Sequence, residues 1–142
     1  MYEGIIFALI TALIFGVWTV FHQQASTHIN PLFGAIIIAT TSLILGLILL
    51  LPKIKSTILY TNPKGIVFVV LVGICALAID VFALKAYSSG LQVSIGGPII
   101  IAGGVAIAAI IGFFLGESIT VMKIVGLSFI ILGTGILATL SR

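Results

Sequence analysis

The stretch from Ile66 to Leu84 reads IVFVVLVGICALAIDVFAL, an apolar run with a single charged position, Asp80. A helix of roughly 20 apolar residues crosses a bilayer, and a carboxylate within it costs roughly 2.5–3.5 kcal/mol on insertion scales. Such residues usually face the interior of a helix bundle or a polar pathway. Asp80 is therefore predicted to be either a proton, cation or substrate site, or a buried polar group that hydrogen-bonds a neighbouring helix.

The whole chain shares the apolar character of this stretch. Of its 142 residues, 61% are hydrophobic and 6% are charged, and the mean hydropathy is +1.45. Soluble domains carry about 25% charged residues, so this composition excludes an ordinary globular fold. The net charge of +3 is small and spread over several segments, which gives no basis for nucleic-acid binding. The lone Cys75 lies in an apolar run and is expected to pack as a small hydrophobic residue.

Five segments are long and apolar enough to cross a membrane as helices. Their continuous hydrophobicity, without alternation, excludes a transmembrane β-barrel. Breaker, capping and charged residues separate them. We therefore predict an all-α integral membrane protein, with residues 1–142 forming one domain, a bundle of five transmembrane helices. The predicted spans are about 4–21, 32–51, 65–87, 94–115 and 121–140.

Basic residues predict how the chain is oriented in the membrane. With five spans, four lysines lie on one side, whereas Lys85 and Arg142 lie at or near the other. This bias predicts a multi-pass plasma-membrane protein with a cytoplasmic N-terminus and an outer C-terminus. Glu3 replaces the positive charge of a secretory signal, so the first span is expected to be permanent. The four lysines are Lys53, Lys55, Lys64 and Lys123.

An odd number of spans has a mechanical consequence. A second five-helix copy in tandem would be inverted in the membrane, and inverted repeats underlie many alternating-access transporters. Because this chain holds one such unit, it is predicted to need a partner besides the lipid bilayer. That partner would be a second copy, parallel or antiparallel, or a sister half-transporter.

Two rows of small residues, spaced four apart, predict close helix packing. They offer grooves in which another backbone can lie, from the same chain or from a second copy. The first span carries Gly4, Ala8, Ala12 and Gly16, and the fourth carries Gly104, Ala108, Gly112 and Gly116. The second row is the predicted helix-packing or dimer interface.

The fourth span begins with a segment, Ser94-Ile95-Gly96-Gly97-Pro98, that weakens a helix. Pro98 frees a backbone carbonyl, and paired glycines lower helix stability. Two interpretations follow. Pro98 marks a gating hinge or a half-helix that faces the substrate, or the segment is a frayed first turn with an ordinary kink.

The remaining candidate substrate or coupling-ion residues lie on two helical faces. Tyr87 shares a face of the third span with Asp80 and small residues, whereas Lys85 is rotated away and is predicted to extend toward the membrane interface. On the first span, Thr11 and Trp18 share a face with Phe15 and His22. That face is either a cavity wall on which Trp18 stacks against substrate, or Trp18 and His22 are interfacial anchors. The third-span face comprises Gly73, Ala76, Asp80, Leu84 and Tyr87.

No constellation typical of an enzyme is visible. His22 and His28 have no carboxylate or cysteine nearby at ligand spacing, and phosphate-binding loops and serine elbows are missing from the sequence. We expect no enzymatic activity, no catalytic residues, no metal and no cofactor. Glu117 is expected to be a solvated turn or capping residue.

Several of these motifs resemble the EamA-type members of the drug/metabolite transporter superfamily. Phe15-Gly16-Val17-Trp18 is similar to the end of their first helix. The C-terminal third resembles the family's ending, with Ala86-Tyr87-Ser88-Ser89-Gly90, Pro98, Gly116-Glu117-Ser118-Ile119-Thr120, Gly126 and Gly133. The resemblance implies a half-size, single five-helix repeat that works as a dimer. Related small multidrug resistance proteins carry a glutamate in the first helix, whereas Leu9–Ile14 holds no carboxylate here.

We therefore expect a secondary transporter or exporter of small metabolites or drug-like molecules, acting as a dimer of five-helix units. In this hypothesis Asp80 binds a proton or cation, and Trp18, Tyr87 and the Pro98 region line the pathway. Two alternatives remain. One is a flippase for lipids or lipid-linked sugars, and the other is a non-transporting subunit of a larger membrane complex.

Overall fold

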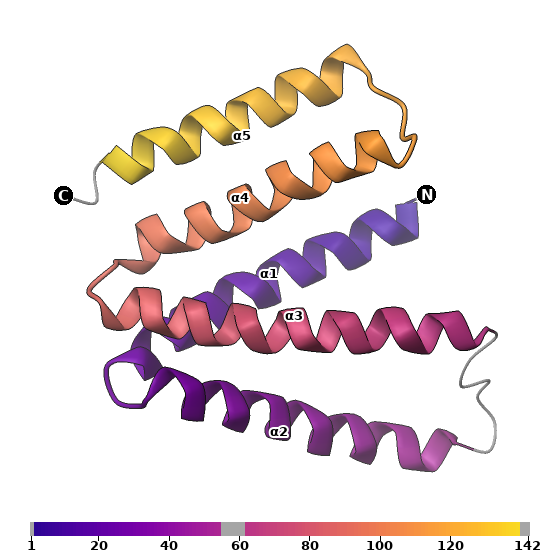
Figure 1. Cartoon of the computed structure of the whole chain (residues 1–142), viewed down its shortest axis with the longest axis vertical. Coiled ribbons are helices and arrows are strands. Elements are labelled where there is room, and N and C mark those ends of the chain that lie inside the picture. Colours follow the sequence, from indigo (N-terminus) through magenta and orange to yellow (C-terminus); the bar gives the residue numbers. More distant parts are fainter. Residues whose placement is uncertain (1, 55–61, 140–142) are drawn as a thin grey trace. The chain divides into compact units, whose positions relative to one another are not determined.

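The computed structural model describes residues 2–54 and 62–139 (Figure 1). Over this part of the chain it contains five helices long and apolar enough to cross a membrane, and no strand. The prediction of an all-α membrane bundle is confirmed. Lys55 and Arg142, used to predict orientation, lie outside the described residues. The elements are α1 (Tyr2–Ser26), α2 (Pro31–Leu50), the short 3-10 helix η1 (Leu51–Lys53), α3 (Pro63–Ser88), α4 (Val93–Phe114) and α5 (Val121–Thr139).

An Asn-Pro pair begins both α2 and α3. The Asn30 side-chain oxygen accepts hydrogen bonds from the amides of Leu32 (3.0 Å) and Phe33 (3.3 Å). The Asn62 side-chain oxygen accepts one from the amide of Lys64 (2.9 Å). The asparagine satisfies amides that have no partner inside the helix, and the following proline presets the first helical φ.

Helix α1 continues beyond its predicted end. The first span was expected to stop near residue 21, but the helix runs through the polar segment His22–Ser26. The helix continues past the predicted span because polarity alone does not end a helix, and the segment contains neither glycine nor proline. The helix ends only where the amide of His28 bonds to the carbonyl of Ala25 (2.9 Å).

Helix α4 is continuous through Pro98. The amides of Ile95 and Gly96 both bond to the carbonyl of Gln92, at 3.0 and 2.8 Å, so the first turn is formed. Neither half-helices nor a frayed first turn are present in α4. Pro98 is tolerated five residues after the first helical position, where it removes one hydrogen-bond donor.

The chain divides into two compact units. The α4–α5 unit comprises α1 up to Gln23 together with α4 and α5, and the α2–α3 unit comprises residues Gln24–Ser88. Within the first, α4 packs beside α5; within the second, α2 packs beside α3 (Figure 1). The α2–α3 packing is tight, because a Cβ added at Gly34 would lie 2.8 Å from Cδ1 of the fully buried Leu84.

Large apolar side chains are exposed along all five helices. Helix α5, for example, has no buried residue between Val121 and Thr139. An aqueous surface with so much exposed hydrocarbon would aggregate, whereas a bilayer solvates it. This distribution fits a multi-pass membrane protein whose helices face lipid.

Candidate functional site

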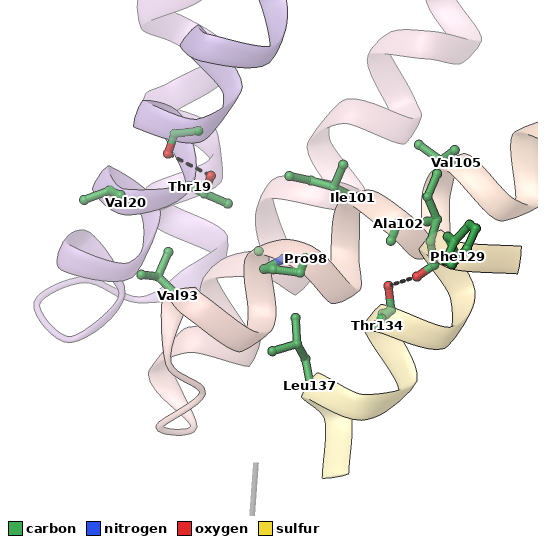
Figure 2. Close-up of a pocket in the computed structure, with 14 residues that line it drawn as sticks. Thr19, Val20, Val93, Pro98, Ile101, Ala102, Val105, Phe129, Thr134 and Leu137 are labelled. Atoms are coloured by element: carbon green, nitrogen blue, oxygen red, sulfur yellow. Dashed lines mark hydrogen bonds between the residues drawn. The ribbon is translucent and has the colours of Figure 1, made fainter. Parts of the chain in front are cut away.

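A pocket of about 630 Å³ lies within the α4–α5 unit, between α1, α4 and α5 (Figure 2). Side chains from all three helices form its wall. They include Thr19 and Val20 from α1, Pro98 and Ile101 from α4, and Phe129 and Leu137 from α5. The pocket therefore combines residues from the beginning and the end of the chain.

The polar groups in this wall are already hydrogen-bonded. The Thr19 hydroxyl lies 2.6 Å from the carbonyl oxygen of Phe15 and 2.9 Å from that of Gly16. The Thr134 hydroxyl donates to the carbonyl of Ile130 at 2.7 Å (Figure 2). None of the described residues that line the pocket is charged. Its wall is apolar in chemical behaviour, despite two hydroxyls.

Glycines account for part of the hollow. Gly16 of α1 and Gly133 of α5 both line the pocket. A Cβ added at either position would meet nothing within 4 Å. Their missing side chains therefore leave open space rather than allowing another backbone to approach.

The predicted residues of the first span lie in different surroundings. Trp18 is half-buried and does not line this pocket; it packs against Phe15, with ring centroids 4.8 Å apart, and against His22, at 3.7 Å. The Thr11 hydroxyl is exposed and donates to the carbonyl of Phe7 at 2.8 Å. Pro98 is thus the only one of the five substrate-site candidates that lines the pocket.

His22 is buried near the end of α1. Its side chain is 3% exposed, and Nδ1 lies 3.3 Å from the carbonyl oxygen of Trp18. Thr19 and Ser26, three residues before and four after, are equally buried. The role of His22 as an interfacial anchor stays a prediction.

Asp80 and Tyr87 lie together on the buried face of α3, in the α2–α3 unit. Asp80 is 8% exposed and Tyr87 2%, and Leu84 lies between them on the same face. Gly73 and Ala76, predicted on this face, are exposed, so the buried part begins at Asp80. The Tyr87 hydroxyl is buried without a hydrogen-bond partner among the described residues. The functional roles of both side chains stay predictions.

Lys85 is exposed, in keeping with its predicted extension away from Asp80. As for metals, no three His, Cys, Asp or Glu side chains gather closely enough to hold an ion within residues 2–54 and 62–139.

The turn between α4 and α5 is built by the Gly-Glu-x-Ile-Thr segment. Gly116, with φ +91°, ends α4, and the amide of Glu117 bonds back to the carbonyl of Gly112 at 3.0 Å. This is the left-handed glycine cap typical of helix ends. At the start of α5, the Thr120 side-chain oxygen accepts a hydrogen bond from the amide of Lys123 (3.3 Å). The Nζ atom of the Lys123 side chain lies 3.7 Å from Oε2 of Glu117. The segment positions two helices, and Glu117 is the turn residue predicted.

The four small residues predicted to form a packing row on α4 lie in different surroundings. Gly104 and Ala108 are exposed, Gly112 is buried under the side chain of Glu117, and Gly116 lies beyond the end of the helix. The use of this row in an interface stays a prediction.

Helix α5 contributes residues to the pocket that were not predicted. Phe129, Thr134 and Leu137 line it, although none was a candidate. The cluster Gly133-Thr134-Gly135, which interrupts an apolar run, was the available signal. A cluster of small residues does not by itself say whether it faces a pocket, a helix or lipid.

Five helices long and apolar enough to cross a membrane fit a multi-pass membrane protein. The sequence profile of the EamA-like transporter family matches residues 2–139. The chain therefore belongs to the EamA-like transporter family, and the extent of the match fits a single half-size repeat. It is a membrane transporter of the drug/metabolite superfamily. Comparison with curated proteins and with solved structures found no match.

Proposed function

We propose that the protein is a secondary transporter that exports small metabolites or drug-like molecules. The observation that carries this proposal is the pocket between α1, α4 and α5. Its volume of about 630 Å³ falls within the roughly 300–1,000 Å³ typical of small-molecule sites. Its wall is drawn from three helices, so movement of one helix would change its shape and opening.

Asp80 is the proposed coupling residue. The chain has three acidic residues, and Asp80 alone lies within a long apolar run. Its carboxylate is largely buried, and buried carboxylates within membranes commonly carry protons or cations through a transport cycle. The Tyr87 hydroxyl, on the same face of α3, is a buried donor that a substrate or water molecule would satisfy.

The transporter is proposed to work as a pair of five-helix units. Alternating access commonly relies on two repeats that move against each other around a central site, and the family match covers one repeat. A second copy, parallel or antiparallel, or a sister half-transporter would supply the other. We place the protein in the plasma membrane with a cytoplasmic N-terminus, on the lysine distribution.

Flux through liposomes tests the proposal. Purified protein is reconstituted, a proton gradient is imposed, and uptake of rhodamine 123, leucine and uridine (a cation, a zwitterion and a neutral solute) is followed. We expect protein-dependent flux of at least one probe, and Asp80→Asn should reduce it to the level of empty liposomes. Glu117→Gln removes the same charge from an exposed carboxylate and should retain wild-type flux.

Two results would count against this function. Wild-type rates in Asp80→Asn would remove Asp80 from coupling. No protein-dependent flux of any of the three probes would contradict secondary transport of solutes of these kinds.

The apolar wall of the pocket favours lipid translocation as a second candidate function. A lipid acyl chain, like a drug-like molecule, needs no polar partner in such a site. Dithionite quenching of a fluorescent phosphatidylcholine in the same liposomes distinguishes the two. A flippase would expose inner-leaflet lipid to dithionite in a protein-dependent manner, without moving the three soluble probes.

A further inference from the structure

We infer that the pocket between α1, α4 and α5 holds the apolar body of the transported molecule and selects aromatic or aliphatic bodies against hydroxylated ones. This inference rests on the proposed function and names the substrate class of its pocket. Three features of the wall support it: the hydrogen-bonding groups that it offers, its apolar side chains and its glycines.

The wall offers little to a polar substrate body. Both threonine hydroxyls have their protons directed to carbonyls of their own helices, at 2.6 to 2.9 Å. Pro98 contributes no amide hydrogen. A sugar hydroxyl that leaves water for this wall would find only the lone pairs of the two threonine oxygens as acceptors, and each hydroxyl left without a partner would lower affinity about tenfold or more.

An apolar body, by contrast, finds a complementary surface. Val20, Ile101 and Leu137 present branched aliphatic groups, and Phe129 presents an aromatic ring (Figure 2). Burial of apolar surface is favourable in proportion to its area. Because no described lining residue is charged, any charge on the substrate has to be satisfied elsewhere.

Replacing a glycine of the wall with a larger residue would fill part of the pocket, which allows a direct test. A side chain at Gly133 or Gly16 would enter open space, since an added Cβ meets nothing within 4 Å. Gly135, two residues along α5, also faces open space but does not line the pocket. Gly133→Leu and Gly135→Leu thus make the same chemical change in the same helix, with the same gain in helix propensity, and differ in whether they fill the pocket.

Equilibrium binding to protein in nanodiscs tests the inference without requiring transport. The two ligands are rhodamine 123 and trehalosamine, which are similar in size and carry one positive charge each, but differ in having an aromatic or a hydroxylated body. Binding to empty nanodiscs is subtracted. We expect the wild-type protein to bind rhodamine 123 at least tenfold more tightly. Gly133→Leu should weaken that binding at least tenfold, while Gly135→Leu should bind like the wild type.

Gly16→Leu fills the same pocket from α1 and should reproduce the loss if Gly133→Leu does not fold. Equal binding of the two ligands by the wild-type protein, or equal losses in Gly133→Leu and Gly135→Leu, would overturn the inference. Binding that follows the expected pattern without any flux would contradict the proposed transport and leave the pocket's specificity standing. The opposite result is flux that Asp80→Asn abolishes and that Gly133→Leu and Gly16→Leu leave intact. It would support the proposed transport and contradict the inferred role of the pocket.

Discussion

Gly34 in the α2–α3 unit and Gly16 and Gly133 in the α4–α5 unit lie in opposite surroundings. In the α2–α3 unit, Gly34 is a contact: Leu84 occupies the space a side chain would need, with Ile29 also close at 3.1 Å. In the α4–α5 unit, Gly16 and Gly133 have nothing within 4 Å of an added Cβ and line a pocket. The same residue type therefore supports tight helix packing in one unit and ligand-sized space in the other.

The largest expected effect on stability comes from crowding the packed glycine. Gly34→Leu should lower the free energy of unfolding by about 1–3 kcal/mol, the usual cost of overpacking, because the fully buried Leu84 side chain, whose Cδ1 lies 2.8 Å from an added Cβ, would have to shift. Gly46→Leu is the matched control in the same helix, since an added Cβ there meets nothing within 4 Å. SDS-induced unfolding followed by circular dichroism measures both.

A double mutant tests the contact between Gly34 and Leu84 directly. Shortening the neighbour with Leu84→Val should relieve part of the cost of Gly34→Ala, so the two changes together should cost less than the sum of their separate effects. Strict additivity, or an equal loss in Gly46→Leu, would contradict the idea that Gly34 serves as a contact for Leu84.

A smaller effect is expected where glycine is needed for its backbone conformation. Gly116→Ala places a side chain at φ +91° and should cost about 1–2 kcal/mol, the penalty for the left-handed conformation. Gly133→Ala, in the middle of α5, should be neutral or stabilise by up to about 1 kcal/mol through helix propensity. Thermal melting in detergent compares them, and similar melting temperatures for the two variants would argue against a conformational role for Gly116.

The smallest effect concerns the ion pair at the same turn. Glu117 and Lys123 lie 3.7 Å apart with side chains 63% and 47% exposed, so Glu117→Gln should change stability by less than about 1 kcal/mol. Raising the salt concentration should shrink the difference further. A larger loss that persists at high salt would show that Glu117 contributes mainly by packing over Gly112 rather than by its charge.

Much of the fold was predictable because its determinants are local. Span number and most boundaries follow from hydropathy and from the Asn-Pro and Gly-Glu segments, whose hydrogen bonds lie within a few residues. The burial of Asp80 followed from the cost of a carboxylate in lipid. Helix α1 runs past the predicted end of the first span because polarity alone does not end a helix, and the burial of His22 was not predicted.

The site was less predictable. Of the candidate substrate residues, Pro98 lines the pocket, whereas Phe129, Thr134 and Leu137 of α5 were not considered. Glycine rows at helical spacing drew attention to close packing, but the spacing is the same whether the neighbouring space is filled or empty. The missing information was the position of side chains distant in the chain.

The amino-acid sequence by itself determined that this protein forms five membrane-spanning helices, because the hydrophobicity of each segment decides separately whether that segment is stable in lipid. The tertiary structure alone decided which glycines are contacts and which are gaps. That distinction depends on whether a side chain such as Leu84, far along the chain, reaches the glycine's surface. Helix packing depends on two segments together, so it cannot be read from the sequence of either segment alone.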